Sequence, residues 1–285
     1  WFILWGLYSN DAVFWIAPLV AIAGFVVLAE YVAGKLKATL PSIVIMVSLC
    51  ATLMIYAVML YMRMVGTSAE FFNLDDVWSF GSTSVNTALL VAIIGFAFQV
   101  GFFLRYRLPV SFALIAFGIV GVLWSLLLTA FGQSLNQYLD YMITLTGLLL
   151  LALGVVVDTK DPKRVNGWAE CAFWLYVIGA PMTIHSVAAL FDAAALVMIP
   201  VIIIAMLFSL FLDRRSPIIS GLVYVGYLAN SGFNQAAIDP SITVALVCFV
   251  VGGLVMAFGF GWQKARHIVL SPFEDQNWRR YLPPS

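Results

Sequence analysis

The basic residues of this chain alternate between the connections that join its long apolar runs. Of the fourteen Lys and Arg residues, all but Arg63 lie on every second connection or after the last run. Basic residues resist transfer across a membrane, so the side that carries them is predicted to be the cytoplasm. The pattern therefore predicts a multi-pass membrane protein with a fixed orientation and a cytoplasmic C-terminus.

The composition leads to the same class of protein. Hydrophobic residues make up 63% of the 285 residues and charged residues 10%. A soluble domain averages about 45–50% apolar and about 25% charged residues. A chain this apolar cannot cover its own surface with polar groups in water, so the lipid bilayer is expected to be its solvent.

Nine apolar runs are candidates for membrane-spanning helices. A span needs about 20 residues, so the eighth run is short unless it extends beyond Ala229. The runs are continuously apolar, whereas the strands of a membrane barrel alternate polar and apolar residues. The nine runs are Ala12–Ala33, Ser42–Tyr61, Ala88–Leu104, Pro109–Phe131, Tyr141–Val157, Cys171–Phe191, Ala193–Leu212, Pro217–Ala229 and Pro240–Trp262.

These runs predict an all-α fold, a polytopic bundle with nine spanning helices. We expect one transmembrane domain over residues 1–262 and a cytoplasmic interfacial tail over residues 263–285. The apolar, aromatic stretch Trp1–Tyr8 is interpreted as the outer end of an earlier helix, which would make ten helices in the intact protein. The alternative is nine helices with an external N-terminus.

A few polar residues within the predicted spans are candidates for a functional site. Ionisable groups inside a bilayer are costly, and His185 is the deepest of the few in this chain. Pro181, four residues earlier, removes a backbone hydrogen bond and is expected to kink the helix. With Thr183, Ser186 and Gln99, these residues could line a polar cavity. In the alternative, a neutral His185 has a structural role and hydrogen-bonds a neighbouring helix.

The densest charged patch is a predicted cytoplasmic loop that contains Asp158, Asp161, Lys163 and Arg164. Two Asp residues three positions apart could hold Mg²⁺ together with a phosphate-bearing lipid. No second acidic motif completes such a site elsewhere in the sequence. The favoured interpretation is a solvated turn whose charges pair with one another.

Cofactor chemistry has little support in the sequence. The three Cys residues are scattered, the two His residues do not form an intramembrane pair, and no Gly-rich loop of the phosphate-binding kind precedes a Lys-Ser or Lys-Thr pair. We therefore expect no cofactor and no metal site. The expected partners are the lipid bilayer and other membrane-protein subunits, and no nucleic acid.

A set of motifs stands out in the second half of the chain. They are Asp158, Asp161-Pro162-Lys163-Arg164, Ala172-Phe173-Trp174-Leu175-Tyr176, Ala180-Pro181, His185, Asp213-Arg214-Arg215, Ser220-Gly221-Leu222-Val223-Tyr224 and Leu282-Pro283-Pro284. These motifs resemble those of a family of uncharacterised bacterial multi-spanning inner-membrane proteins. The resemblance implies the bacterial inner membrane as the location, and no chemistry. Tyr176 stands where this family usually has His, which departs from any two-His site.

Three functional hypotheses follow. The first is a non-catalytic accessory or scaffold subunit of a larger membrane complex, because buried charge is scarce and small residues suited to helix contacts are many. The second is a permease or channel for a small molecule with a mid-membrane site near His185. The third is a lipid-acting enzyme at the cytoplasmic face around Asp158, Asp161 and Arg164. An enzyme is the least favoured of the three.

Overall fold

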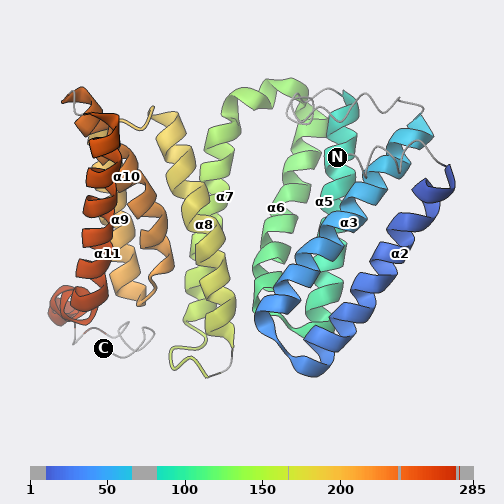
Figure 1. Cartoon of the computed structure of the whole chain (residues 1–285), viewed down its shortest axis with the longest axis horizontal. Coiled ribbons are helices and arrows are strands. Elements are labelled where there is room, and N and C mark those ends of the chain that lie inside the picture. Colours follow the sequence, from blue (N-terminus) through green and yellow to red (C-terminus); the bar gives the residue numbers. More distant parts are fainter. Residues whose placement is uncertain (1–10, 66–81, 166, 237–238, 274–275, 277–285) are drawn as a thin grey trace. The chain divides into compact units, whose positions relative to one another are not determined.

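A computed structural model describes residues 11–65, 82–165, 167–236, 239–273 and 276 of the chain (Figure 1). Within these ranges the regular secondary structure is helical and no strand occurs. The chain forms two compact units, residues 1–136 and residues 137–285. The stretch Trp1–Tyr8, interpreted from the sequence as part of an earlier helix, lies outside the described residues.

In its described residues, the first unit is built from four long helices. Helices α2 and α3 pack together, α3 packs on α5, and α5 packs on α6. Pro109 begins α6, where its missing N–H costs no hydrogen bond. Gly132, with φ of 66°, ends the same helix. The elements are α2 (Asp11–Ala29), η1 (Glu30–Leu36), α3 (Thr39–Val65), α5 (Ser82–Tyr106), α6 (Pro109–Phe131) and η3 (Gly132–Tyr138), the last of which continues into the second unit.

The part of the second unit that the structure describes contains five long helices. Figure 1 shows α7 and α8 side by side as a hairpin, and α10 packs against α8, α9 and α11. Its buried apolar core includes Ile184 and Ala188 of α8 and Met198 of α9, with Tyr224 of α10 packed on them. The elements are α7 (Leu139–Asp158), α8 (Trp168–Leu190), α9 (Ala195–Leu212), α10 (Ser216–Gln235), α11 (Pro240–Leu270) and η4 (Ser271–Phe273).

Glycines allow the backbones of α7 and α8 to approach closely. A Cβ atom built on Gly147 would lie 2.7 Å from the backbone nitrogen of Thr183 and 2.9 Å from the carbonyl oxygen of Gly179. Further along the hairpin, a Cβ on Gly154 would lie 2.6 Å from the ring of Tyr176. Small residues at such positions are typical of helix pairs in membranes, where packing at short range replaces the hydrophobic effect as the force of association.

All nine predicted runs form helices in the structure. Eight of the helices in the described part of the chain are long and apolar enough to cross a membrane. The exception is α10, which extends beyond Ala229 to Gln235 and ends in a polar stretch that includes Asn230 and Asn234. Its assignment as a ninth span stays a prediction.

Helix α11 continues beyond the end that the hydropathy pattern predicted. The apolar run stops at Trp262, whereas the helix ends at Leu270. Trp262, Arg266 and Leu270 are buried and spaced four residues apart, so they lie on one face of the helix. Packing of this face stabilises the helix beyond Trp262. The first residues of the predicted tail, residues 263–285, therefore belong to α11.

Candidate functional site

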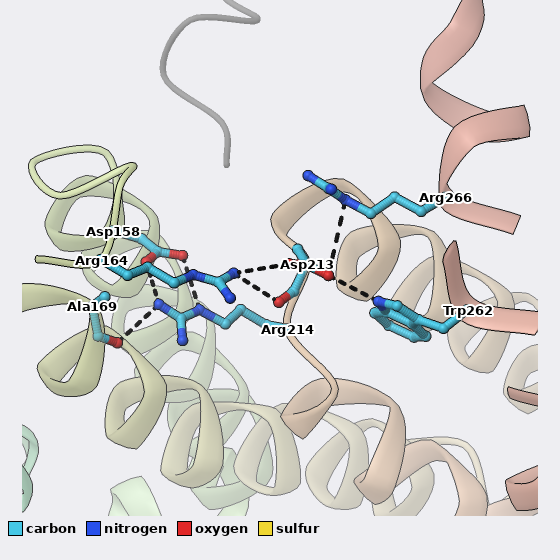
Figure 2. A network of polar contacts seen from close by, with 7 residues as sticks. All are labelled: Asp158, Arg164, Ala169, Asp213, Arg214, Trp262 and Arg266. Carbon is cyan, nitrogen blue, oxygen red and sulfur yellow. Dashed lines mark hydrogen bonds and ion pairs between the residues drawn. The ribbon is translucent and has the colours of Figure 1, made fainter. Parts of the chain in front are cut away.

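A network of ionic contacts joins four helices at the basic end of the second unit (Figure 2). At its centre, Asp158 is the last residue of α7 and only 5% of its side chain is exposed. Arg214 donates to both carboxylate oxygens of Asp158, from Nε at 3.2 Å and from Nη2 at 2.6 Å. The same Nη2 donates to the backbone carbonyl of Ala169 in the first turn of α8, at 2.9 Å.

Asp213 forms a second centre in the turn between α9 and α10. It follows the last residue of α9 in the left-handed conformation, with φ of 53°. Its carboxylate accepts a hydrogen bond from the indole Nε1 of Trp262 at 2.8 Å and pairs with Arg164 at 3.2 Å. The buried Arg266 of α11 lies with its Nε 4.0 Å from the same carboxylate.

Of the four charged residues that the sequence singled out, Asp158 ends α7, and the other three lie in the loop between α7 and α8. Asp161 is buried, and its side chain accepts from the backbone N–H of Val165 at 2.9 Å, which stabilises the loop itself. Arg164 reaches out of the loop and donates to the backbone carbonyl of Asp213 at 2.9 Å. Lys163 is exposed. Asp158 is thus bound by Arg214, and Asp161 accepts a hydrogen bond within its own loop.

The charged groups of this network are paired with one another, Asp158 with Arg214 and Asp213 with Arg164. Both oxygens of the buried Asp158 carboxylate accept a hydrogen bond from the guanidinium of Arg214, a strong and geometrically specific arrangement. Among the described residues, no group of three or more His, Cys, Asp or Glu side chains gathers as a metal-ligand set. The arrangement is suited to joining helix ends.

Sequence reasoning placed Asp158, Asp161 and Arg164 in this region and missed half of the network. Asp213 and Arg214 were noted only as part of a motif, and Trp262 only as the end of the ninth apolar run. The pairs Asp158–Arg214 and Asp213–Trp262 are 56 and 49 residues apart in sequence. The spacing of residues within one segment of the sequence cannot predict contacts between residues this far apart. The one available signal was the density of opposite charges on neighbouring predicted cytoplasmic turns.

His185 of α8 is hydrogen-bonded to a neighbouring helix. Its Nδ1 lies 2.6 Å from the hydroxyl of Tyr224 on α10. The His185 side chain is otherwise exposed on the surface of the second unit. A hydrogen bond to a neighbouring helix is what the structural alternative for His185 expects, and the choice between the two roles stays a prediction.

The other predicted cavity residues are mostly engaged within their own helix pair. Thr183 donates to the carbonyl of Gly179 at 2.9 Å, and Ser186 donates to the carbonyl of Met182 at 2.6 Å. Thr144 of α7 donates to Ser186 at 2.7 Å, which ties α7 to α8. Helix α8 continues through Pro181, whose side chain is exposed.

Gln99 belongs to the first unit, on α5, and is buried there. Its side chain lies beside the thiol of Cys50 on α3. The four other residues of the predicted cavity belong to the second unit. Thr183, Ser186 and His185 lie along one helix of the second unit, whereas Gln99 is a residue of the first unit.

We expect the Tyr224→Phe substitution to lower the free energy of unfolding by about 0.6–1.7 kcal/mol, the range for hydrogen bonds between membrane helices. The measurement is denaturation of the purified protein in mixed micelles with increasing dodecyl sulfate. Tyr227→Phe is the matched control, since Tyr227 lies on the same helix and is 52% exposed. Equal stability of the two variants would contradict a structural role for the His185–Tyr224 contact.

Comparisons with protein-family models, with curated proteins and with solved structures found no match.

Proposed function

We propose that this chain is a non-catalytic accessory or scaffold subunit of a larger membrane assembly. In this proposal it is a multi-pass protein of the bacterial cytoplasmic membrane, with the basic helix ends and the C-terminus in the cytoplasm. The observation that carries the proposal is the network of Asp158, Asp213, Arg164 and Arg214. Its charged groups hydrogen-bond one another and join helix ends, as expected of a structural element.

The surface of α11 supports the proposal. Gly253, Ala257 and Gly261 are spaced four residues apart, and the two glycines have open space where a Cβ atom would project. A helix face that meets only lipid gains nothing from small residues, whereas a second helix can approach its backbone closely at such a face. We infer that α11 presents this face to another membrane helix.

A permease or channel is the second candidate. It rests on the exposure of His185 on the surface of the second unit, since a polar side chain at that depth needs water or a protein partner. An aqueous path along His185 and Tyr224 would satisfy this need. A partner helix that covers His185 would satisfy it equally well, and that arrangement belongs to the first proposal.

The lipid-acting enzyme has the least support. The carboxylate of Asp158 is bound by Arg214, and Asp161 is bound to its own loop. A catalytic role would require both carboxylates to exchange these contacts for a substrate or a metal ion.

The test of the first proposal is extraction from native membranes in mild detergent through a C-terminal tag, followed by native mass measurement. We expect a stoichiometric complex with other membrane chains. Gly253→Leu should reduce the retained partner by roughly tenfold or more, because the added side chain holds the helices apart. Gly121→Leu on α6 is the matched control, since Gly121 also has open space around it.

Two results would overturn the proposal. One is a lone monomer at every detergent concentration that preserves other complexes of the same membrane. The other is equal loss of partner in the Gly253→Leu and Gly121→Leu variants. A monomer whose uptake of a small solute is abolished by His185→Ala would establish the permease in its place.

A further inference from the structure

The first unit contains an apolar groove between α2, α3 and α5. Its volume is about 240 Å³, and its walls include Val26 of α2, Leu49 of α3 and the aromatic rings of Phe98 and Phe102 on α5. Gly101 forms part of the lining, is exposed and has open space where a Cβ atom would project. The groove is smaller than the roughly 300–1,000 Å³ of pockets that enclose a whole small molecule, so it fits a single hydrocarbon chain.

A polar cluster stands at one end of this groove. Glu30 accepts hydrogen bonds from Arg105 Nε at 3.0 Å and Arg105 Nη2 at 3.1 Å, and from the hydroxyl of Tyr106 at 3.0 Å. Arg105 and Tyr106 also line the groove. Glu30 begins the π-helical segment η1. Such segments are rare in proteins, and those that occur are often found at functional sites.

Arg105 keeps hydrogen-bonding capacity beyond its contact with Glu30. A guanidinium group has five N–H donors, of which Glu30 takes two. The Arg105 side chain is 66% exposed, so its other donors are accessible. A phosphate group is the ligand that such donors bind best, because its oxygens match the planar fork of arginine.

The charge around the groove selects an anionic ligand. Lys35, Lys37 and Arg107 are exposed at the same ends of η1 and α5, and with Arg105 they outnumber the single Glu30. Basic residues at the membrane surface attract anionic lipids. The groove itself lies along the apolar spans Ile16–Leu36 and Leu89–Tyr106, so its ligand arrives from the bilayer.

We propose that this groove binds one acyl chain of an anionic glycerophospholipid whose phosphate accepts hydrogen bonds from Arg105. The acyl chain lies along Phe98, Gly101 and Phe102, and Glu30 holds the guanidinium at the end of the groove. This site is separate from the proposed role of α11 and from the network around Asp158.

The experiment measures retained phosphatidylglycerol by native mass spectrometry after the full chain is purified, delipidated and titrated with this lipid in detergent. We expect one molecule to be retained preferentially over phosphatidylcholine. Gly101→Leu fills the groove from an open position and should weaken binding roughly tenfold, as should Arg105→Gln, which removes the charged donors. Gly121→Leu is the matched control for an added leucine in the same unit.

Glu30→Gln separates phosphate binding from the stability of the Glu30–Arg105 pair. It breaks the ion pair and leaves the guanidinium in place, so phosphatidylglycerol should be retained at least as well as by the wild type. The proposal is overturned if Gly101→Leu and Gly121→Leu retain the lipid equally, or if phosphatidylcholine binds as well as phosphatidylglycerol. It is also overturned if a side chain of another protein occupies the groove in the isolated complex.

Discussion

Arg214→Ala is expected to lower the free energy of unfolding by about 3–5 kcal/mol, the cost of leaving a buried carboxylate without its partner. Asp158 and Arg214 are 5% and 11% exposed, so water cannot replace the lost hydrogen bonds easily. The substitution also removes the contact with the carbonyl of Ala169 and so releases α8 from the turn after α9. The measurement is dodecyl sulfate denaturation in mixed micelles, followed by loss of helical circular dichroism.

Two further variants test this explanation. Asp158→Leu combined with Arg214→Met replaces the ion pair by apolar side chains and should recover most of the lost stability, since no buried charge is left alone. Arg105→Ala breaks an ion pair whose partners are 66% and 47% exposed, and it should have a much smaller effect. If Arg214→Ala and Arg105→Ala lowered the free energy of unfolding equally, burial of the Asp158–Arg214 pair would not explain its contribution to stability.

Gly147→Ala is expected to destabilise the α7–α8 hairpin by about 1–3 kcal/mol, although alanine is the better helix former. The added methyl group would meet the backbone of Thr183 and of Gly179, at distances of 2.7 and 2.9 Å that no side-chain rotation can relieve. The two helices must therefore move apart. The same denaturation measurement applies.

Gly121→Ala is the control for the intrinsic effect of the substitution. Gly121 lies inside α6 with nothing within 4 Å of the added atom, so its replacement should be neutral or slightly stabilising. If Gly147→Ala changed the stability no more than Gly121→Ala does, the two helices would not approach as closely at Gly147 as the structure shows.

The helices could be predicted from the sequence because apolar runs in a bilayer satisfy their backbone hydrogen bonds within one segment. The run Pro109–Phe131 coincides with α6 at both ends, since Pro109 and Gly132 mark its start and stop. The end of α11 was missed because the face formed by Trp262, Arg266 and Leu270 packs on its neighbours. Hydropathy along the chain does not report that packing.

The candidate site was predicted only in part. Asp158 and Arg164 stood out because charges are rare in this chain, and local density is visible in a sequence. Their partners Arg214 and Asp213 come from another turn, and the choice among several basic and acidic residues depends on which helix ends meet. His185 was predicted to lie deep within a span, while its contact with Tyr224 of α10 followed only from the packing of α8 against α10.

The apolar runs alone are enough to predict the class of this protein. They are long enough to cross a membrane, and they form helices because each helix satisfies its own backbone hydrogen bonds. Which polar groups meet depends on the packing of the helices. Contacts such as Arg214 with Asp158, or Arg105 with Glu30, join residues 56 and 75 positions apart. They depend on how side chains of different helices fit together, and neither hydropathy nor local spacing contains that information.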